Sequence, residues 1–215
     1  MIELWNYYRS GTSHRVRIAL NLKQIAWQYK ELNLLEQDHK SQEYLTINPQ
    51  GLAPAMIVQG QTLTQSPAML EYIEERWPTP PLLPTDITER AKVRAMAMLI
   101  ACDIHPLNNL RVLNEVKSLT DDGGLPAHWI HKWISLGFTA LESMLVKDKQ
   151  RDLNYCFGDE PGLVECYLIP QVYSAKRFNM DMSSFPAINR IDKTCASLQA
   201  FIDAHPDNQP DAPKS

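Results

Sequence analysis

Hydrophobic and polar positions alternate near the start of the chain and later recur at helical spacing. Strand-like runs at 2–7 and 27–34 flank a run at 13–22 whose apolar residues recur every three or four positions. A strand, a helix and a second strand in this order predict a βαβ unit. Two shorter apolar runs, 55–58 and 62–63, are separated by Gln59-Gly60-Gln61, which predicts a hairpin.

A helix is predicted from about residue 66 to residue 76, with Ser66 as its N-cap and Pro67 at the first helical position. Four prolines follow between residues 77 and 86, and neither a helix interior nor a central strand accommodates them. We therefore expect a linker at 81–87.

The linker separates an α/β domain at 1–80 from an all-helical domain at 88–215. Strand signals almost vanish beyond the linker, and Pro106 and Pro170 lie inside helical patterns, where the first should kink its helix. The polar tail from Pro206 is expected to be loose. The helices are predicted at about 88–118, 126–147, 162–176 and 186–204.

Composition excludes several classes of protein. The 21 Lys and Arg against 25 Asp and Glu give a net charge of -4, which argues against a nucleic-acid partner. The 4 cysteines show neither a C-x-x-C pair nor metal-ligand spacing, so we expect reduced thiols and a cytoplasmic location. No apolar run is long enough to span a membrane, and no export signal is expected at the N-terminus.

The turn between the first strand and the first helix carries the candidate chemistry. No acidic residue lies between Leu4 and Lys30, whereas five cations do. Ser10, Thr12 and Ser13 supply hydroxyls, and the helix that starts here presents unpaired N–H groups and a positive dipole end. These groups favour an anion. The alternative, equally open on the residues alone, is that Ser13 merely caps the helix and that the cations are solvated or paired.

If the anion is a thiolate, the turn must lower a thiol pKa from about 8.5 toward neutrality. Each unit of that change needs about 1.4 kcal/mol of preferential stabilisation of the thiolate. One or two charge-assisted hydrogen bonds, at about 1.5 to 3 kcal/mol each, suffice.

The string from Tyr7 to Lys23 resembles the signature of zeta-class glutathione transferases, a family that includes maleylacetoacetate isomerases and glutathione-dependent maleylpyruvate isomerases. The similarity extends through Asn48-Pro49-Gln50, Ala53-Pro54 and Gln65-Ser66 to 103–109, and so covers nearly the whole chain. It implies a thioredoxin-like N-terminal domain followed by a helical bundle, glutathione as cofactor, a cis Pro54 and a homodimer.

The resemblance also implies site residues. Ser10 would stabilise the glutathione thiolate, with Thr12 and the backbone around Gly11 assisting. Most zeta-class members carry Ser-Ser-Cys where this chain has Ser10-Gly11-Thr12, so any role of that cysteine is absent. His39, Gln50, His105 and Asn109 match positions that line the glutathione pocket in relatives, although each residue taken alone favours a structural or surface role. The implied cofactor-binding set is Ser10, Gly11, Thr12, Ser13, His14, Arg15, His39, Gln50, Ala53, Gln65, Ser66, His105, Asn109, Leu110 and Arg111.

The implied reaction is the conversion of maleylacetoacetate to fumarylacetoacetate in tyrosine and phenylalanine catabolism, by thiolate addition, bond rotation and elimination. The substrate carries two carboxylates, which Arg9, Arg111 and Arg177 would bind. Arginine at position 111 is a feature of bacterial maleylpyruvate isomerases that resemble this chain, although Arg111 could instead pair with Glu115 on the helix surface. Alternatives are a maleylpyruvate isomerase of gentisate breakdown, a general glutathione transferase and a non-enzymatic glutathione-binding protein.

One departure from the family concerns a later helix. Relatives place Thr and Asp at its N-cap and third position, where this chain has Gly162 and Glu165. Glu165 should still reach back to the backbone at the start of the helix.

Overall fold

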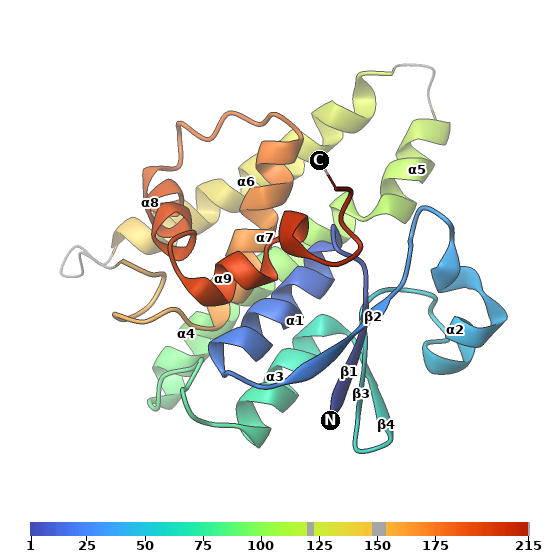
Figure 1. Ribbon diagram of the computed structural model, residues 1–215. Coiled ribbons are helices and arrows are strands. Elements are labelled where there is room, and N and C mark those ends of the chain that lie inside the picture. Colours follow the sequence, from blue (N-terminus) through green and yellow to red (C-terminus); the bar gives the residue numbers. More distant parts are fainter. Residues whose placement is uncertain (120–122, 148–153, 215) are drawn as a thin grey trace. The chain divides into compact units, whose positions relative to one another are not determined.

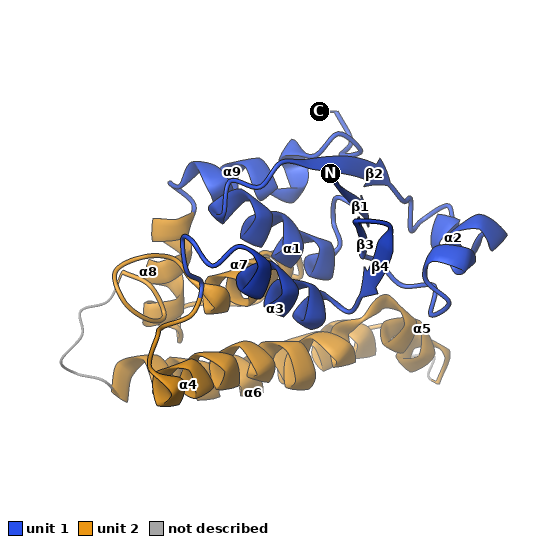
Figure 2. Cartoon of the chain, turned by 90° about the horizontal axis from the view of Figure 1, so that it is seen from below, with its two compact units in different colours: residues 1–82, 196–215 blue, residues 83–195 orange. Residues whose placement is uncertain are grey.

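The computed structural model describes residues 1–119, 123–147 and 154–214, which form two compact units. Figure 2 colours unit 1, residues 1–82 and 196–215, and unit 2, residues 83–195. The break between residues 82 and 83 lies in the expected linker. The end of the chain, however, belongs to unit 1 and not to the helical unit in which we expected it.

Unit 1 contains a four-stranded sheet of order β2-β1-β3-β4. Strand β1 (Ile2–Asn6) pairs in parallel with β2 (Trp27–Glu31) and antiparallel with β3 (Ala55–Val58). Strands β3 and β4 (Gln61–Thr64) form a hairpin through Gln59 and Gly60, both with positive φ. The predicted βαβ unit and hairpin are therefore confirmed.

Helices cover the sheet of unit 1 (Figure 1). Helix α1 (Gly11–Leu22) packs between α3 (Ser66–Arg76) and α9 (Gln199–Ala204) on one face of the sheet. The short α2 (Gln42–Ile47), which the sequence pattern did not predict, lies on the opposite side with the 3₁₀ turn η1 (Asp38–Lys40). The core between sheet and helices includes the fully buried Leu4, Ile18, Leu20, Met69 and Ile73.

Polar contacts fix the proline-rich segment that closes unit 1. The ammonium of Lys23 donates to the carbonyl oxygens of Trp77 and Pro80 at 2.5 and 2.7 Å and pairs with the Glu74 carboxylate at 2.7 Å. Glu74 in turn accepts a hydrogen bond from the Leu82 N–H at 3.0 Å. Both charged side chains are almost fully buried, so the pair stabilises this path of the chain only because the carbonyl and N–H groups complete its hydrogen bonding.

The C-terminal tail is ordered, contrary to the expectation that it is loose. After α9 it forms a 3₁₀ turn, η4 (Pro206–Asn208), and the buried Gln209 follows. The amide of Gln209 donates to the carbonyl oxygens of Asp203 and His205 at 2.7 and 2.8 Å. A polar composition suggested mobility, but here a polar side chain of the tail bonds to the backbone at the end of α9.

Unit 2 is helical, and its first predicted helix is not continuous. The pattern at 88–118 divides into α4 (Ile87–Met98), a π-helical turn η2 (Leu99–Ile104), a 3₁₀ turn η3 (His105–Asn108) and α5 (Leu110–Ser118). Pro106 lies in η3, and Asn109 then starts a new helix by accepting a hydrogen bond from the Arg111 N–H at 3.2 Å. The proline therefore interrupts the helix instead of kinking it.

Three more helices complete unit 2: α6 (Leu125–Lys147), α7 (Leu163–Arg177) and α8 (Pro186–Cys195). Helix α7 is buried from Leu163 to Val172 with Pro170 inside it, as the pattern predicted. The predicted helix at 186–204 is wrong in its extent, because α8 and α9 are separate helices in different units.

Glu165 starts α7 in the way the sequence predicted. Its carboxylate accepts from the Gly162 N–H at 2.7 Å and from the Cys156 N–H at 2.6 Å. The carboxylate therefore supplies the N3 half of a capping box, which satisfies the N–H of the N-cap, while the glycine offers no side-chain acceptor of its own.

Candidate active site

The turn that joins β1 to α1 is held by its own backbone. The Ser10 N–H donates to the Tyr7 carbonyl at 3.0 Å, and α1 begins at Gly11. The Ser10 hydroxyl oxygen accepts from the Ser13 N–H at 3.3 Å, so Ser10 is the N-cap. The alternative in which Ser13 caps the helix is therefore wrong.

The two catalytic candidates lie next to each other. The Ser10 and Thr12 hydroxyl oxygens are 2.9 Å apart, and the Thr12 hydroxyl donates to the Ala53 carbonyl at 3.0 Å. A hydroxyl has a single proton, so Thr12 has none left and Ser10 must donate in the bond between them. The N–H of Ser13 polarises the Ser10 hydroxyl further, which makes Ser10 the stronger donor. Thr12 orients Ser10 and connects it to Ala53.

The phenol of Tyr7 does not supply a charge at this turn. Burial raises the pKa of Tyr7 to about 12. Tyr7 therefore stays neutral near pH 7, and the donors at the start of α1 itself are the Ser10 hydroxyl and the N–H groups at the helix end.

Ala53 lies directly before a cis peptide bond to Pro54, as the resemblance implied. Among the described residues, no acceptor pairs with the Ala53 N–H, although its carbonyl accepts from Thr12. Tyr44 and Asn48 fix the loop before it, since both donate to the Leu52 carbonyl at 2.7 Å. The loop therefore presents one backbone donor beside the two hydroxyls.

Gln50 and Gln65 come together from different loops. The Gln65 amide donates to the Gln50 side-chain oxygen at 2.7 Å, and both residues are exposed. Gln65 has a φ of 67°, a left-handed conformation that is uncommon outside glycine and that concentrates at functional sites. The backbone of His39 lies close to Gly51, next to Gln50 in the same loop. A Cβ added to Gly51 would lie only 2.8 Å from the His39 carbonyl oxygen.

Ser66 is the first residue of α3, and Gln65, not Ser66, occupies the N-cap position that we had assigned to the serine. The Ser66 hydroxyl is buried and accepts from the Arg15 guanidinium at 3.4 Å. Arg15 is itself buried, so it acts on the α3 N-terminus from inside the unit.

Several residues expected near the cofactor lie inside the protein. The side chains of Ser13 and His14 are fully buried, and burial lowers the pKa of His14 well below its usual value. Only their backbone groups can face a ligand at the turn. The pKa of the half-buried His39 is also lowered, by burial and then by Lys40. Both imidazoles are therefore neutral near pH 7.

Most of the cations around the turn already pair with groups of the protein. The fully buried Arg17 bonds to the carbonyl oxygens of Tyr8 and Ala204 at 2.8 and 3.1 Å. Lys23 is held by the proline-rich segment, and Lys30 lies 4.0 Å from the Glu3 carboxylate. The alternative of paired cations is thus correct for these three residues.

The remaining candidates are surface cations and residues of unit 2. Arg9 lies over the Tyr8 ring at 5.8 Å, and Arg177 stacks on Phe178 at 4.4 Å. Arg111 is exposed, and within the described part of the chain no ion pair joins it to Glu115. The other unit 2 candidates are the half-buried His105 and Asn109 and the exposed Leu110.

A metal centre is not found in residues 1–119, 123–147 and 154–214, which contain no group of three His, Cys, Asp or Glu residues able to hold an ion. Cys102, Cys156, Cys166 and Cys195 are all free. In the same ranges, no helix is both long and apolar enough to cross a bilayer.

A βαβ unit, a hairpin, a cis-proline loop and a hydroxyl-capped first helix together define a glutathione-binding domain of the transferase type. Comparison with known proteins agrees. The model of the glutathione S-transferase N-terminal domain matches residues 9–76. The chain is 44% identical over 215 residues to a maleylacetoacetate isomerase of Pseudomonas aeruginosa, covering 99% of each chain.

Two solved structures extend the match. A bacterial zeta-class maleylpyruvate isomerase has a TM-score of 0.95 at 46% identity, over 98% of this chain and 100% of the other. A maleylacetoacetate isomerase of Anaeromyxobacter dehalogenans, solved with bound glutathione, has a TM-score of 0.88 at 38% identity, over 99% and 98% of the two chains. The chain therefore belongs to the glutathione S-transferase family.

Two residues that hold the turn were not identified from the sequence. The buried Arg17 was counted with the cations of the turn, although an arginine between the apolar Val16 and Ile18 is a signal of internal hydrogen bonding. Asp211, in the tail that we expected to be loose, bonds to the Tyr8 N–H at 2.9 Å. No local pattern identifies such a long-range partner.

Proposed function

We propose that this protein is a glutathione-dependent cis–trans isomerase that converts maleylacetoacetate to fumarylacetoacetate. The observation that carries the proposal is the Ser10–Thr12–Ala53 hydrogen-bond chain at the start of α1. It leaves one hydroxyl donor and one backbone N–H beside a helix N-terminus, which suits a thiolate. The full-length similarity to relatives named as maleyl isomerases supports the substrate class.

The residues present fit glutathione. The Ala53 N–H and the α3 N-terminus at Ser66 are backbone donors suited to the cysteinyl amide and the γ-glutamyl carboxylate. Gln50 and Gln65 add amide groups beside them. When bound, glutathione supplies the thiol that adds to the cis double bond, permits rotation and leaves on elimination.

The protein's own groups act on charge and position. Ser10 gives up its neutral bond to Thr12 and donates to the thiolate, while its oxygen still accepts from the Ser13 N–H. A charge-assisted bond of about 1.5–3 kcal/mol replaces a neutral one of about 1 kcal/mol, so the exchange favours the ionised thiol. Arg9, Arg111 and Arg177 are the cations that we assign to the two substrate carboxylates.

Maleylpyruvate is the second candidate substrate, and Arg111 favours it. Arg111 is exposed and free of Glu115, so its guanidinium is available to a compact dianion whose carboxylates lie close together. The similarity alone does not discriminate, since the maleylpyruvate and maleylacetoacetate isomerases are 46% and 44% identical to this chain.

Turnover of maleylacetoacetate, maleylpyruvate and a chlorinated aromatic, measured side by side by ultraviolet absorbance, tests the proposal. We expect both maleyl compounds to turn over faster than the aromatic. Equal or better turnover of the aromatic would show a general transferase. Absence of turnover with all three, alongside tight glutathione binding, would show a non-enzymatic glutathione-binding protein.

The Arg111→Ala variant, with Lys117→Ala on the same helix as the matched control, then assigns the substrate. If Arg111 binds a carboxylate, Arg111→Ala lowers kcat/KM for the preferred maleyl compound about tenfold or more, the effect of a lost charged hydrogen bond. The control should stay within about twofold, because exposed charges far from a ligand are screened. Equal effects of the two variants would exclude a specific role of Arg111.

We also propose that the protein works in the cytoplasm as a homodimer. Four free cysteines support a reducing compartment, and the family resemblance supports the dimer. A light-scattering mass of two chains is expected, and a mass of one chain would exclude the dimer.

A further inference from the structure

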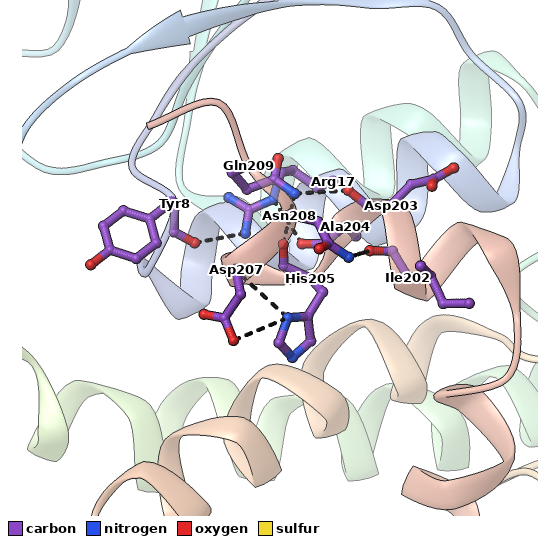
Figure 3. Close-up of polar contacts among 9 residues, drawn as sticks. All are labelled: Tyr8, Arg17, Ile202, Asp203, Ala204, His205, Asp207, Asn208 and Gln209. Atoms are coloured by element: carbon purple, nitrogen blue, oxygen red, sulfur yellow. Dashed lines mark hydrogen bonds and ion pairs between the residues drawn. The ribbon is translucent and has the colours of Figure 1, made fainter. Parts of the chain in front are cut away.

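The tail of the chain returns to the turn that carries Ser10. After α9, the Gln209 amide donates back to the carbonyl oxygens of Asp203 and His205 (Figure 3). The carbonyl oxygens of Ala204 and Tyr8 accept from the same Arg17 guanidinium. Residues more than 180 positions apart in sequence are joined by this one side chain. The tail is therefore part of the surroundings of the turn.

Arg17 holds the turn from the inside of unit 1. Its guanidinium donates to the Asn6 side-chain oxygen at 2.9 Å, to the Tyr7 carbonyl at 3.4 Å and to the Tyr8 carbonyl at 2.8 Å. The side chain has no exposed surface. Because a buried guanidinium is costly unless its donors are satisfied, this geometry fixes the last residue of β1 and the first two of the turn together.

Asp211 holds the same turn by accepting a hydrogen bond from one of its backbone N–H groups. One carboxylate oxygen accepts from the Tyr8 N–H at 2.9 Å, and the other accepts from the Tyr29 hydroxyl. Burial, and then the bond to Asp211, raise the pKa of Tyr29, so its phenol remains a donor. Tyr29 lies on β2 opposite Leu4 of β1. Asp211 therefore connects the second strand to the turn.

Tyr8 is thus bonded on both of its backbone groups by charged side chains. Its carbonyl accepts from Arg17 and its N–H donates to Asp211. Tyr7, which shares the peptide bond with Tyr8, accepts from the Ser10 N–H at 3.0 Å. A displacement of Tyr8 is therefore transmitted to Ser10 through a single turn of backbone.

We propose that Asp211 is a positioning residue for the reaction, which fixes Ser10 and the start of α1 against the glutathione thiol by holding the Tyr8 N–H. The inference rests on the proposed role of Ser10. A misplacement of about 1 Å in a reacting group lowers rates by about 100-fold, so a bond two residues from Ser10 is close enough to matter. Asp211 touches no substrate and acts only through the turn.

The test compares four variants. Asp211→Asn removes the charge at nearly constant shape, and Asp211→Glu keeps the charge. Asp207→Asn is the matched control, since Asp207 is an acidic residue of the same tail whose side chain is 70% exposed. Tyr29→Phe removes the other partner of Asp211 but leaves the Tyr8 N–H bond in place.

Two readouts separate positioning from stability. One is the pKa of the glutathione thiol in the complex, from the ultraviolet absorbance of the thiolate, which needs no maleyl substrate. The other is kcat for the preferred maleyl compound, measured together with KM for glutathione in the same reaction. If no maleyl compound turns over in the unsubstituted protein, the proposed function fails, while the thiol pKa still tests the role of Asp211.

We expect Asp211→Asn to raise the thiol pKa by about half a unit or more and to lower kcat about tenfold, with KM for glutathione within about twofold. Asp211→Glu should recover at least about half of kcat, and Asp207→Asn and Tyr29→Phe should keep the thiol pKa. Melting temperatures detect any loss of fold, and Asp211→Glu provides the test if Asp211→Asn does not fold.

A thiol pKa and kcat for Asp211→Asn equal to those of the unsubstituted protein would overturn the proposal. So would a Tyr29→Phe variant with the same kinetic loss as Asp211→Asn, because Asp211 would then act by anchoring the tail to β2. An Asp211→Glu variant as defective as Asp211→Asn would also overturn it, since the charge would then have no role.

Discussion

Separate replacements of Ser10 and Thr12 test the assignment of the thiolate donor. Ser10 donates to Thr12 and accepts from the Ser13 N–H, so Ser10→Ala removes both a donor and a helix cap. Ser10→Gly removes the same donor, but glycine is nearly as good an N-cap, within a few tenths of a kcal/mol, whereas alanine costs about 1 kcal/mol. The two variants therefore separate catalysis from helix stability.

The expected magnitude follows from the lost bond. A charge-assisted hydrogen bond contributes about 1.5–3 kcal/mol, which corresponds to a rise of about 1 to 2 units in the thiol pKa and a loss of about 10- to 150-fold in kcat/KM. Ser10→Ala and Ser10→Gly should show the same kinetic loss. Ser10→Ala should in addition lower the free energy of unfolding by about 1 kcal/mol relative to Ser10→Gly.

Thr12→Val is the matched comparison, because it removes one hydroxyl of the Ser10–Thr12–Ala53 hydrogen-bond chain and leaves the Ser10 hydroxyl, the proposed thiolate donor, in place. Only neutral bonds of about 1 kcal/mol are lost, so kcat/KM should fall about fivefold or less and the thiol pKa should stay within about half a unit. The measurements are thiolate absorbance against pH, initial rates and urea unfolding. A larger rise of the thiol pKa in Thr12→Val than in Ser10→Gly would refute the assignment of Ser10 as donor.

Three further predictions concern stability. Because burial holds the pKa of His14 well below its usual value of about 6.5, the unfolded chain binds the extra proton, and the free energy of unfolding should fall as pH drops below about 6.5. Urea unfolding between about pH 7 and about pH 5 should show this slope, and His14→Leu should reduce it. Glu142→Gln should lower the free energy of unfolding by about 1–2 kcal/mol, since the carboxylate accepts from two N–H groups at the start of α8, at 2.7 and 3.0 Å; unchanged thermal unfolding would contradict this. Gly137→Ala should cost about 1–3 kcal/mol in the same assay, despite the better helix propensity of alanine, because its Cβ would lie 2.3 Å from the buried Ile104 side chain; a rise in stability would show that Ile104 moves aside.

Elements with a strong local signal were predictable from the sequence. Period-two and period-3.6 patterns predicted a strand at 2–7 and a helix at 13–22, and the structure has them at 2–6 and 11–22. The bounds of the helix at 66–76 match because a proline near its start and prolines after its end mark both limits. In each case the chemistry that fixes the element lies within a few residues of it.

Elements that depend on distant partners were not predictable in this way. Apolar periodicity continues from α4 into η2, so the change to a π-helical turn at Leu99 leaves no mark in the pattern. The tail is polar, but Gln209 is buried because backbone carbonyls accept from its amide. At the site, the family resemblance implied Ser10 and Thr12, but nothing in the sequence indicated the hydrogen bond of Thr12 to Ala53, which lies 41 positions further on.

The use of the cations changes how the turn must attract an anion. On the sequence alone, five cations and no acid between Leu4 and Lys30 suggested a strongly positive surface. In the structure, Arg17 and Lys23 are buried and bonded to carbonyl oxygens, and Lys30 faces Glu3. A charge fixed in this way holds the backbone in place. The attraction of a thiolate therefore depends on a few aligned groups, the Ser10 hydroxyl and the N-terminus of α1, and their alignment depends in turn on the buried cations.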